Sequence, residues 1–158
     1  MKIKKSLFLL GSLLTVLPLA GCKDPAAGKI KLDFWIYGDA DELNMYRSLV
    51  DKFNETYGEE HGIYVATSTK PAGSSYLSLI QYTASSRSGP DVFFTIENEF
   101  KKWVDMDICA DITTEFNNVT DIDVSDIYDS IVRRLRYNPH TNSSEPGEPQ
   151  YGYPLDIQ

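Results

Sequence analysis

The sequence predicts an α/β fold in which parallel strands alternate with helices. Three short apolar segments, residues 30–37, 63–69 and 91–96, have the composition of buried strands. Each is followed by a segment in which apolar residues recur every three or four positions, as they do on one face of a helix. A repeated strand–helix–strand order requires helical crossovers between parallel strands of one sheet.

The first strand and helix carry the clearest signals. Residues 30–37 (IKLDFWIY) alternate between apolar and polar types and then become continuously apolar, which predicts a buried strand. A helix of about four turns should follow, with Asp39 or Asp41 as its N-cap and with Gly58 and Gly62 ending it. Its inward positions are Leu43, Tyr46, Val50, Phe53 and Tyr57.

The next elements repeat this order. Residues 63–69 (IYVATST) are β-branched and aromatic enough for a second strand. A turn at 71–73 then leads, with Ser74 or Ser75 as the cap, into a helix over 76–86. Ser88-Gly89-Pro90 breaks that helix before the third strand, 91–96, and a third helix over 97–106 places Trp103 in the core.

The regularity weakens beyond residue 110. Residues 111–120 are expected to be loop, 124–137 a helix, and 138–150, with three prolines and a glycine, an exposed loop. Residues 151–158 have the composition of a buried strand, with Tyr151 and Tyr153 as packing residues. A domain should not stop in such a strand, so the sequence is expected to be the front portion of a longer protein and to fold poorly alone.

The first 22 residues have the pattern of an export signal. A cationic start, MKIKKS, precedes an apolar run from residue 7 to residue 20, which is shorter than the roughly 18 to 20 residues that span a bilayer. The ending Leu19-Ala20-Gly21-Cys22 resembles the bacterial lipobox, which implies cleavage before Cys22 and a lipid on its thiol. The alternative is an ordinary signal peptide with a cysteine nearby. The predicted organisation is a signal at 1–21, a flexible lipid-anchored linker at 22–29 and a lobe at 30–158.

Charge and cysteine content exclude several classes of protein. Without the three signal lysines, 12 basic residues face 23 acidic ones. Nucleic acid is therefore an unsuitable partner, since phosphates would repel so acidic a surface. Cys109 has no cysteine left to pair with once Cys22 carries lipid, and its apolar neighbours indicate a small core residue.

Catalytic and metal motifs are absent from the sequence. His61 and His140 are the only histidines, and neither has a partner at metal-ligand spacing. Asp121, Asp123 and Asp126 are spaced as in a calcium loop, but the glycine and closing glutamate of that motif are missing, which favours a solvated acidic loop. We therefore expect no metal, no cofactor and no catalytic residues.

Several segments, taken in order, resemble the N-terminal part of extracellular (family 1-like) solute-binding lipoproteins of sugar ABC transporters. They are IKLDFWIYGD, DKFNETYG, IYVATST, PAGSSYLSLIQ, TASSRSGPDVFF, WVDMDICADIT and YGYPLD. The resemblance implies part of the N-terminal lobe of a type II periplasmic-binding-protein-like fold, with a second lobe closing on the ligand. One departure is that Met106 or Asp107 stands where the family usually has a glycine before its Leu-x-Asp-Leu segment.

The ligand should bind beyond the carboxyl ends of the strands, where the crevice of an open parallel sheet lies. The loops there offer the carboxylates, amides and aromatic rings that hold sugar hydroxyls and cover their C–H faces. The loop after the second strand contributes Ser74 and Tyr76. The resemblance adds positions in the loops after the first and third strands and after Tyr-Gly-x-Pro: Tyr37, Asp39, Thr95, Glu97, Asn98, Asp156 and Gln158.

Competing structural roles exist for several of these residues. Asp39 is as well suited to capping a helix as to binding a ligand, Asn98 could simply start the third helix, and Trp35 is better explained as core than as ligand contact. The predicted function is capture of an extracellular carbohydrate, most simply an oligosaccharide, and its delivery to the permease subunits of an ABC importer, without catalysis. The alternatives are a lipid-anchored extracellular glycan hydrolase and a solute-binding protein for a peptide, polyamine or metal chelate.

Overall fold

The computed structural model describes residues 24–120, 123 and 126–155. The predicted signal (1–21), the lipidation position Cys22 and the predicted ligand residues Asp156 and Gln158 lie outside the described residues. Glu97 and Asn98 are described as helical backbone without their side chains.

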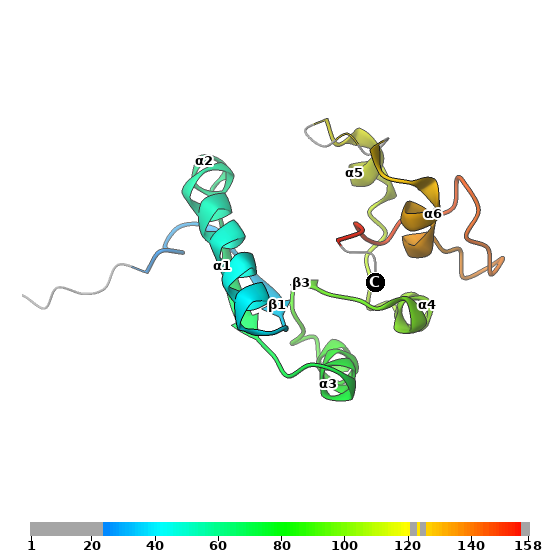
Figure 1. Ribbon diagram of the computed structural model, residues 1–158, viewed down its shortest axis with the longest axis horizontal. Coiled ribbons are helices and arrows are strands. Elements are labelled where there is room, and N and C mark those ends of the chain that lie inside the picture. Colours follow the sequence, from blue (N-terminus) through cyan, green and yellow to red (C-terminus); the bar gives the residue numbers. More distant parts are fainter. Residues whose placement is uncertain (1–23, 121–122, 124–125, 156–158) are drawn as a thin grey trace, which may run out of the picture.

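Three parallel strands form the sheet, as the sequence predicted (Figure 1). They are β1 (Ile30–Ile36), β2 (Ile63–Thr69) and β3 (Val92–Phe93), in the order β2-β1-β3. The third strand is much shorter than the predicted 91–96 segment, because the N–H of Phe94 donates to the Tyr76 hydroxyl instead of to a strand.

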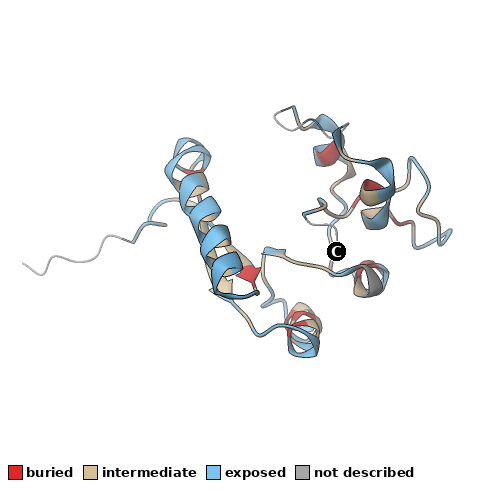
Figure 2. Ribbon diagram, viewed as in Figure 1, coloured by how far each residue is buried: buried red, intermediate tan, exposed pale blue. Residues whose placement is uncertain are grey.

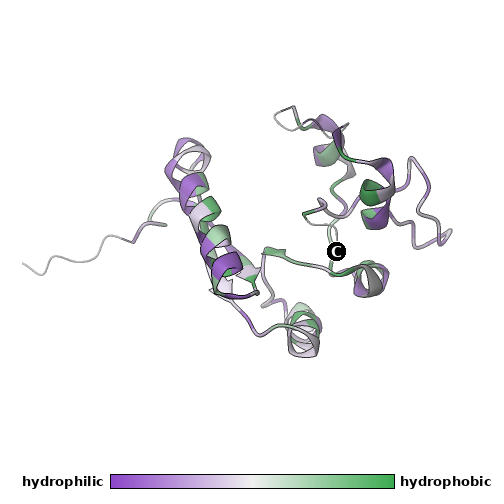
Figure 3. Ribbon diagram, viewed as in Figure 1, coloured by the Kyte–Doolittle hydropathy of each residue, from purple (hydrophilic) through white to green (hydrophobic). Residues whose placement is uncertain are grey.

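The first crossover contains two helices where one was predicted. Asp39 caps α1 (Ala40–Glu55), and Thr56, with φ −116° and ψ −98°, separates it from the short helix α2 (Tyr57–His61). Gly62 ends α2 in the left-handed conformation, with φ 67°, which glycine adopts without steric cost. Figure 3 shows hydrophilic and hydrophobic residues alternating along α1, as expected of a helix with one face against a sheet.

The second crossover contains α3 (Ser74–Ser85), whose N-cap is Gly73 rather than the predicted Ser74 or Ser75. Trp35 of β1 is buried against Tyr76 and Ile80 of this helix, which confirms its predicted core position. Successive strand residues face opposite sides of a sheet, so Phe34 lies on the other side. There its ring and that of Tyr46, from α1, both contact Phe94. The helices α1 and α3 therefore cover opposite faces.

The predicted third helix is confirmed as α4 (Glu97–Asp105), and the elements after it differ from the prediction. The expected loop at 111–120 contains α5 (Thr113–Asn118), and the single helix expected over 124–137 is reduced to α6 (Asp129–Val132) and the 3-10 turn η2 (Arg133–Leu135). Residues 151–155 form no strand. Their neighbour Gln150 instead makes an isolated antiparallel bridge with Arg136.

Two adjoining clusters of buried side chains make up most of the core among the described residues. Trp103 of α4 joins the sheet-side cluster with Trp35, Tyr76 and Ile80, while Phe100, Val104 and Tyr137 form the second. Figure 2 shows that α1 is largely exposed, whereas α3 and α4 each carry buried residues. In the part of the chain that is described, no helix is both long and apolar enough to cross a membrane.

Two helices are followed by a residue in the left-handed conformation, which glycine adopts more easily than other residues. After α3, the N–H of Ser88 bonds to the Thr83 carbonyl and Arg87 has φ 54°. After α4, the N–H of Ile108 bonds to the Trp103 carbonyl and Asp107 has φ 55°. This is the Schellman arrangement, in which glycine is the usual left-handed residue. Asp107 is also one of the two positions at which the resemblance noted above led us to expect a glycine.

Replacing Arg87 or Asp107 by glycine is expected to stabilise the protein by about 1 kcal/mol each, because a side chain costs roughly 1–2 kcal/mol in the left-handed region. Urea unfolding would measure the gain. Met106→Gly is the matched control, since Met106 directly precedes Asp107 but has an ordinary φ of −95°. A gain in the Met106 variant, or a loss in the other two, would contradict this explanation.

Candidate ligand site at the carboxyl edge of the sheet

The loops that follow the three strands lie at one edge of the sheet because the strands are parallel. Residues 37–39 follow β1, residues 70–73 lead from β2 into α3, and residues 94–96 lead from β3 into α4. The register places the last residues of β1 and β2, Ile36 and Thr69, side by side. The structure thus brings together the three loops in which the sequence placed ligand residues.

Four aromatic rings form a cluster at this edge. The Tyr37 ring lies 4.6 Å from that of Tyr76 and 5.6 Å from that of Phe94, measured between centroids. Tyr46 approaches Phe94 to 5.0 Å from the side of α1. Tyr37 is half-buried, and its pKa is raised by burial and, to a smaller extent, by the nearby Glu42 carboxylate. Its hydroxyl therefore stays protonated at neutral pH, so it can both donate and accept a hydrogen bond.

Tyr76 is the buried member of this aromatic cluster. Its side chain is 1% exposed, and its hydroxyl accepts the N–H of Phe94 at 3.0 Å. Burial is the main cause that raises the pKa of Tyr76 well above its usual range, so the group remains neutral. This burial disfavours the direct ligand contact predicted for Tyr76; in the structure its ring packs against that of Tyr37 and its hydroxyl bonds to the residue that follows β3.

Asp39 is the N-cap of α1, one of the two caps predicted from the sequence. Its Oδ1 accepts the N–H groups of Asp41 at 2.9 Å and Glu42 at 3.0 Å. Glu42 returns the contact, because its Oε2 accepts the Asp39 N–H at 2.8 Å and completes a capping box. The Asp39 side chain is exposed, so the cap leaves it accessible from the edge.

Two substitutions of Asp39 should separate capping from ligand binding. Asp39→Ala is expected to lower the free energy of unfolding by about 1 kcal/mol, because the cap is lost. Asp39→Ser should cost only a few tenths of that, since serine is also a good cap. If the carboxylate contacts ligand, both variants bind it more weakly in calorimetry although only the alanine variant is destabilised. Unchanged affinity in the serine variant would restrict Asp39 to capping.

The other predicted ligand-binding positions that the structure describes lie in the segments that follow β2 and β3. Ser74 is exposed at the first residue of α3, and Thr95 is half-buried between β3 and α4, so both belong to the edge. Glu97 and Asn98 begin α4 next to Thr95. The part of the chain that the structure describes therefore contributes positions from each of the three loops.

Two cationic residues at the same edge were missed by the sequence analysis. Lys70 directly follows β2, and its Nζ lies 4.1 Å from the centroid of the buried Trp35 ring. Arg47 reaches across from α1, and its Nη2 donates to the Thr69 hydroxyl at 2.8 Å. Lys70 could have been predicted at the carboxyl edge, because it lies between the predicted second strand and the turn that begins at Pro71. The Arg47 contact depends on how α1 packs and has no sequence signature.

Hollows of about 250 and 440 Å³ lie away from this edge, around the start of β3 and beside α2. Within residues 24–120, 123 and 126–155 there is no group of three histidine, cysteine, aspartate or glutamate residues that could hold a metal ion. Aromatic rings, hydroxyls, an exposed carboxylate and the cations Lys70 and Arg47 are the groups that this edge offers.

Comparison with known proteins gives structural neighbours only. No protein-family model matches the sequence, and no curated protein matches it. Among solved structures, the chain is similar to an extracellular solute-binding protein family 1 member from Alicyclobacillus acidocaldarius, with a TM-score of 0.57 and 17% identity over 68% of this chain. It is also similar to an ABC substrate-binding protein from Listeria monocytogenes in complex with cycloalternan, with a TM-score of 0.59 and 18% identity over 70% of this chain.

The chain spans only about a quarter of the length of these proteins, 25% and 27% respectively. The chain therefore has an α/β fold similar to that of extracellular solute-binding proteins, and the partial coverage fits an incomplete lobe of such a fold.

Proposed function

We propose that this chain is part of the substrate-binding component of an ABC importer, which captures an extracellular carbohydrate and delivers it to the permease subunits. The observation that carries the proposal is the carboxyl edge, where the loops that hold the half-buried Tyr37 ring and the polar Asp39, Ser74 and Thr95 meet. Sugars are bound by such pairings of an aromatic face with hydroxyl and carboxylate groups. The solved structure of one neighbour, an ABC substrate-binding protein in complex with cycloalternan, supports the choice of a carbohydrate as ligand.

The proposal includes the position of the protein in the cell. Lipid attached to Cys22 would anchor it at the outer face of the cell membrane, with the ligand site exposed to the surroundings. The protein itself needs no catalytic group for this role, because binding and domain closure are sufficient. The remaining contacts to the sugar, including those proposed for Glu97, Asn98, Asp156 and Gln158, would complete the site with the second lobe.

Calorimetric titration of the full-length protein against mono- and oligosaccharides, peptides and polyamines tests this function. We expect saturable binding of one oligosaccharide series, and about tenfold weaker binding in Tyr37→Ala, because loss of a stacking ring costs about 1–1.5 kcal/mol. Tyr82→Ala is the control, since Tyr82 is 73% exposed on α3 and is not part of the aromatic cluster. Binding of peptides or polyamines alone would overturn the carbohydrate assignment. Release of new reducing ends from the bound glycan would indicate a hydrolase.

A further inference from the structure

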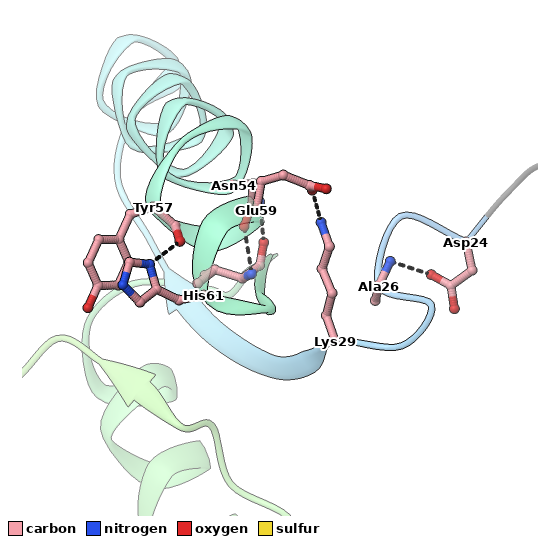
Figure 4. A network of polar contacts seen from close by, with 8 residues as sticks. Asp24, Ala26, Lys29, Asn54, Tyr57, Glu59 and His61 are labelled. Carbon is pink, nitrogen blue, oxygen red and sulfur yellow. Dashed lines mark hydrogen bonds and ion pairs between the residues drawn. The ribbon is translucent and has the colours of Figure 1, made fainter.

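Lys70 is a half-buried cation without an acidic partner. Among the described residues, three lysine or arginine side chains are half-buried: Lys29, Lys70 and Arg136. Lys29 pairs with Glu59 at the amino edge of the sheet, where β1 and β2 begin (Figure 4), and Arg136 pairs with Asp129 at 2.9 Å. Both of these side chains are 18% exposed, and each has the carboxylate that a charge withdrawn from water requires. Lys70 forms no ion pair with any described residue.

The sheet holds Lys70 at the carboxyl edge. Its N–H donates to the Ile36 carbonyl at 2.9 Å, which extends the pairing of β1 and β2 by one residue. Its Nζ lies 4.1 Å from the centroid of the buried Trp35 ring. The ring face attracts the ammonium group but provides no second charge to neutralise it. The charge of Lys70 is therefore only partly compensated within the described part of the chain.

Arg47 brings a second cation to the end of β2. Its Nη2 donates to the hydroxyl of Thr69, the residue before Lys70, at 2.8 Å. A guanidinium group has five N–H donors in a planar set that matches the oxygens of a carboxylate or another oxyanion. Successive strand residues face opposite sides of a sheet, so Arg47 and Lys70 flank the strand end from opposite sides. A ligand beyond the end of β2 could reach both.

The carboxylates near this edge already have hydrogen-bond donors. Both oxygens of Asp33, on the same face of the sheet as Lys70, accept hydrogen bonds from side chains of β1 and β2 at 2.7 Å. Asp39 and Glu42 accept backbone N–H groups in the capping box of α1. The acceptors are thus engaged within the chain, whereas the two cations have donors to offer.

We propose that Lys70 and Arg47 bind an anionic group of the ligand, so that the captured carbohydrate is an acidic oligosaccharide, with the carboxylates of uronic acids or with sulfates. This inference rests on the proposed carbohydrate function and names its substrate class. A neutral hydroxyl would accept the same donors but would not neutralise the half-buried charge. The predicted mature chain is itself acidic, with 12 basic and 23 acidic residues. Such a ligand would therefore be bound by these local contacts and not by net charge.

Calorimetric titration of the full-length protein with matched oligosaccharides tests the proposal. The acidic probes are galacturonate and alginate oligosaccharides, each paired with its methyl ester, and carrageenan oligosaccharides, paired with their desulfated form. Malto- and xylo-oligosaccharides are the neutral series. We expect an acidic series to bind, and its neutralised form to bind at least about tenfold more weakly, because hydrogen bonds to a charged group are lost. Higher ionic strength should weaken binding of the acidic form.

Variants of the two cations connect this preference to the edge. Lys70→Met keeps an apolar stem over the Trp35 ring but removes the charge, so it should lower the affinity for the acidic form to nearly that for the neutralised form. Lys70→Arg should retain the preference. Arg47→Gln, at an exposed position, should reduce it and is the independent test if Lys70→Met does not fold. Lys52→Met is the matched control, because Lys52 is an exposed lysine in the last turn of α1.

Three results would overturn the proposal: equal affinity for the acidic and neutralised forms, binding of the neutral series alone, or a preference that neither Lys70→Met nor Arg47→Gln reduces. The third is the result expected if a carboxylate elsewhere in the full-length protein pairs with Lys70. Carbohydrate still binds in all three cases, so the proposed function stands. Binding of no carbohydrate in the panel would refute the proposed function and this inference with it.

Discussion

Trp103→Ala is expected to lower the free energy of unfolding by about 3–5 kcal/mol, the usual cost of removing a fully buried tryptophan. Trp103 is 0% exposed and lies in one cluster with Trp35, Tyr76 and Ile80. Its ring centroid is 5.7 Å from that of Phe93, so it connects α4 to the sheet. The loss would shift the midpoint of urea unfolding of the full-length protein, which is the measurement that checks it.

A conservative change at the same position refines this prediction. The Trp103 Nε1 is buried and has no hydrogen-bond partner among the described residues. Trp103→Phe removes this unpaired donor together with part of the ring, so its cost should be smaller, about 1–2 kcal/mol. Met106→Ala is the control, because Met106 follows the same helix and is 48% exposed. A loss below about 1 kcal/mol in Trp103→Ala would mean that α4 is not packed on the sheet as described.

Asn54→Ala is expected to destabilise the protein by about 2–3 kcal/mol, because two hydrogen bonds to a strand backbone are lost together. The Nδ2 of Asn54 donates to the Val65 carbonyl at 2.8 Å, and its Oδ1 accepts the Val65 N–H at 2.8 Å. In β2, the first strand of the β2-β1-β3 order, the Asn54 amide thus satisfies backbone groups that a neighbouring strand would otherwise pair.

Removal of this side chain should also expose the edge of β2 to other chains. We expect Asn54→Ala to aggregate at lower temperature than the parent protein in light-scattering measurements. Asn44→Ala is the matched control, since Asn44 is an exposed asparagine of the same helix α1. Equal stability and equal aggregation in the two variants would show that the Val65 backbone does not depend on the Asn54 amide.

Strands and helices with a strong periodic pattern were predictable from the sequence, because residues close together in the chain determine them. The strand at 30–37 and the helix after Asp39 follow from alternation, helical spacing and a capping aspartate, and the structure confirms both as β1 and α1. The third strand was overestimated, because apolar composition alone does not show that the Phe94 N–H will bond to the hydroxyl of Tyr76. A contact between residues 18 positions apart leaves no mark on local pattern.

The C-terminal elements were less predictable because they are short and depend on tertiary contacts. The helix α5 has only six residues, and Gln150, far along the chain, accepts the Ile112 N–H and donates its own N–H to the Thr113 hydroxyl at its start. Helices this short are not stable through their own propensity. The same reason applies to residues 124–137, where a regular apolar spacing did not produce one continuous helix.

The candidate site was predictable in position but not in detail. Parallel strands place the following loops at one edge, so Tyr37, Asp39, Ser74 and Thr95 could be expected there together. The burial of Tyr76 and the approach of Arg47 to Thr69 arise from how α3 and α1 pack. Sequence spacing does not contain this information.

The central claim is that the carboxyl edge of this sheet forms one wall of a carbohydrate site. Hydrogen exchange measured by mass spectrometry on the full-length protein, with and without the oligosaccharide that binds it, tests this claim most directly. We expect slower exchange on binding at residues 37–39, 70–76 and 94–98, the three loops of the edge. Slower exchange confined to the amino edge, at residues 24–29 and 54–62, or no change in any of the three loops while sugar binds, would contradict it.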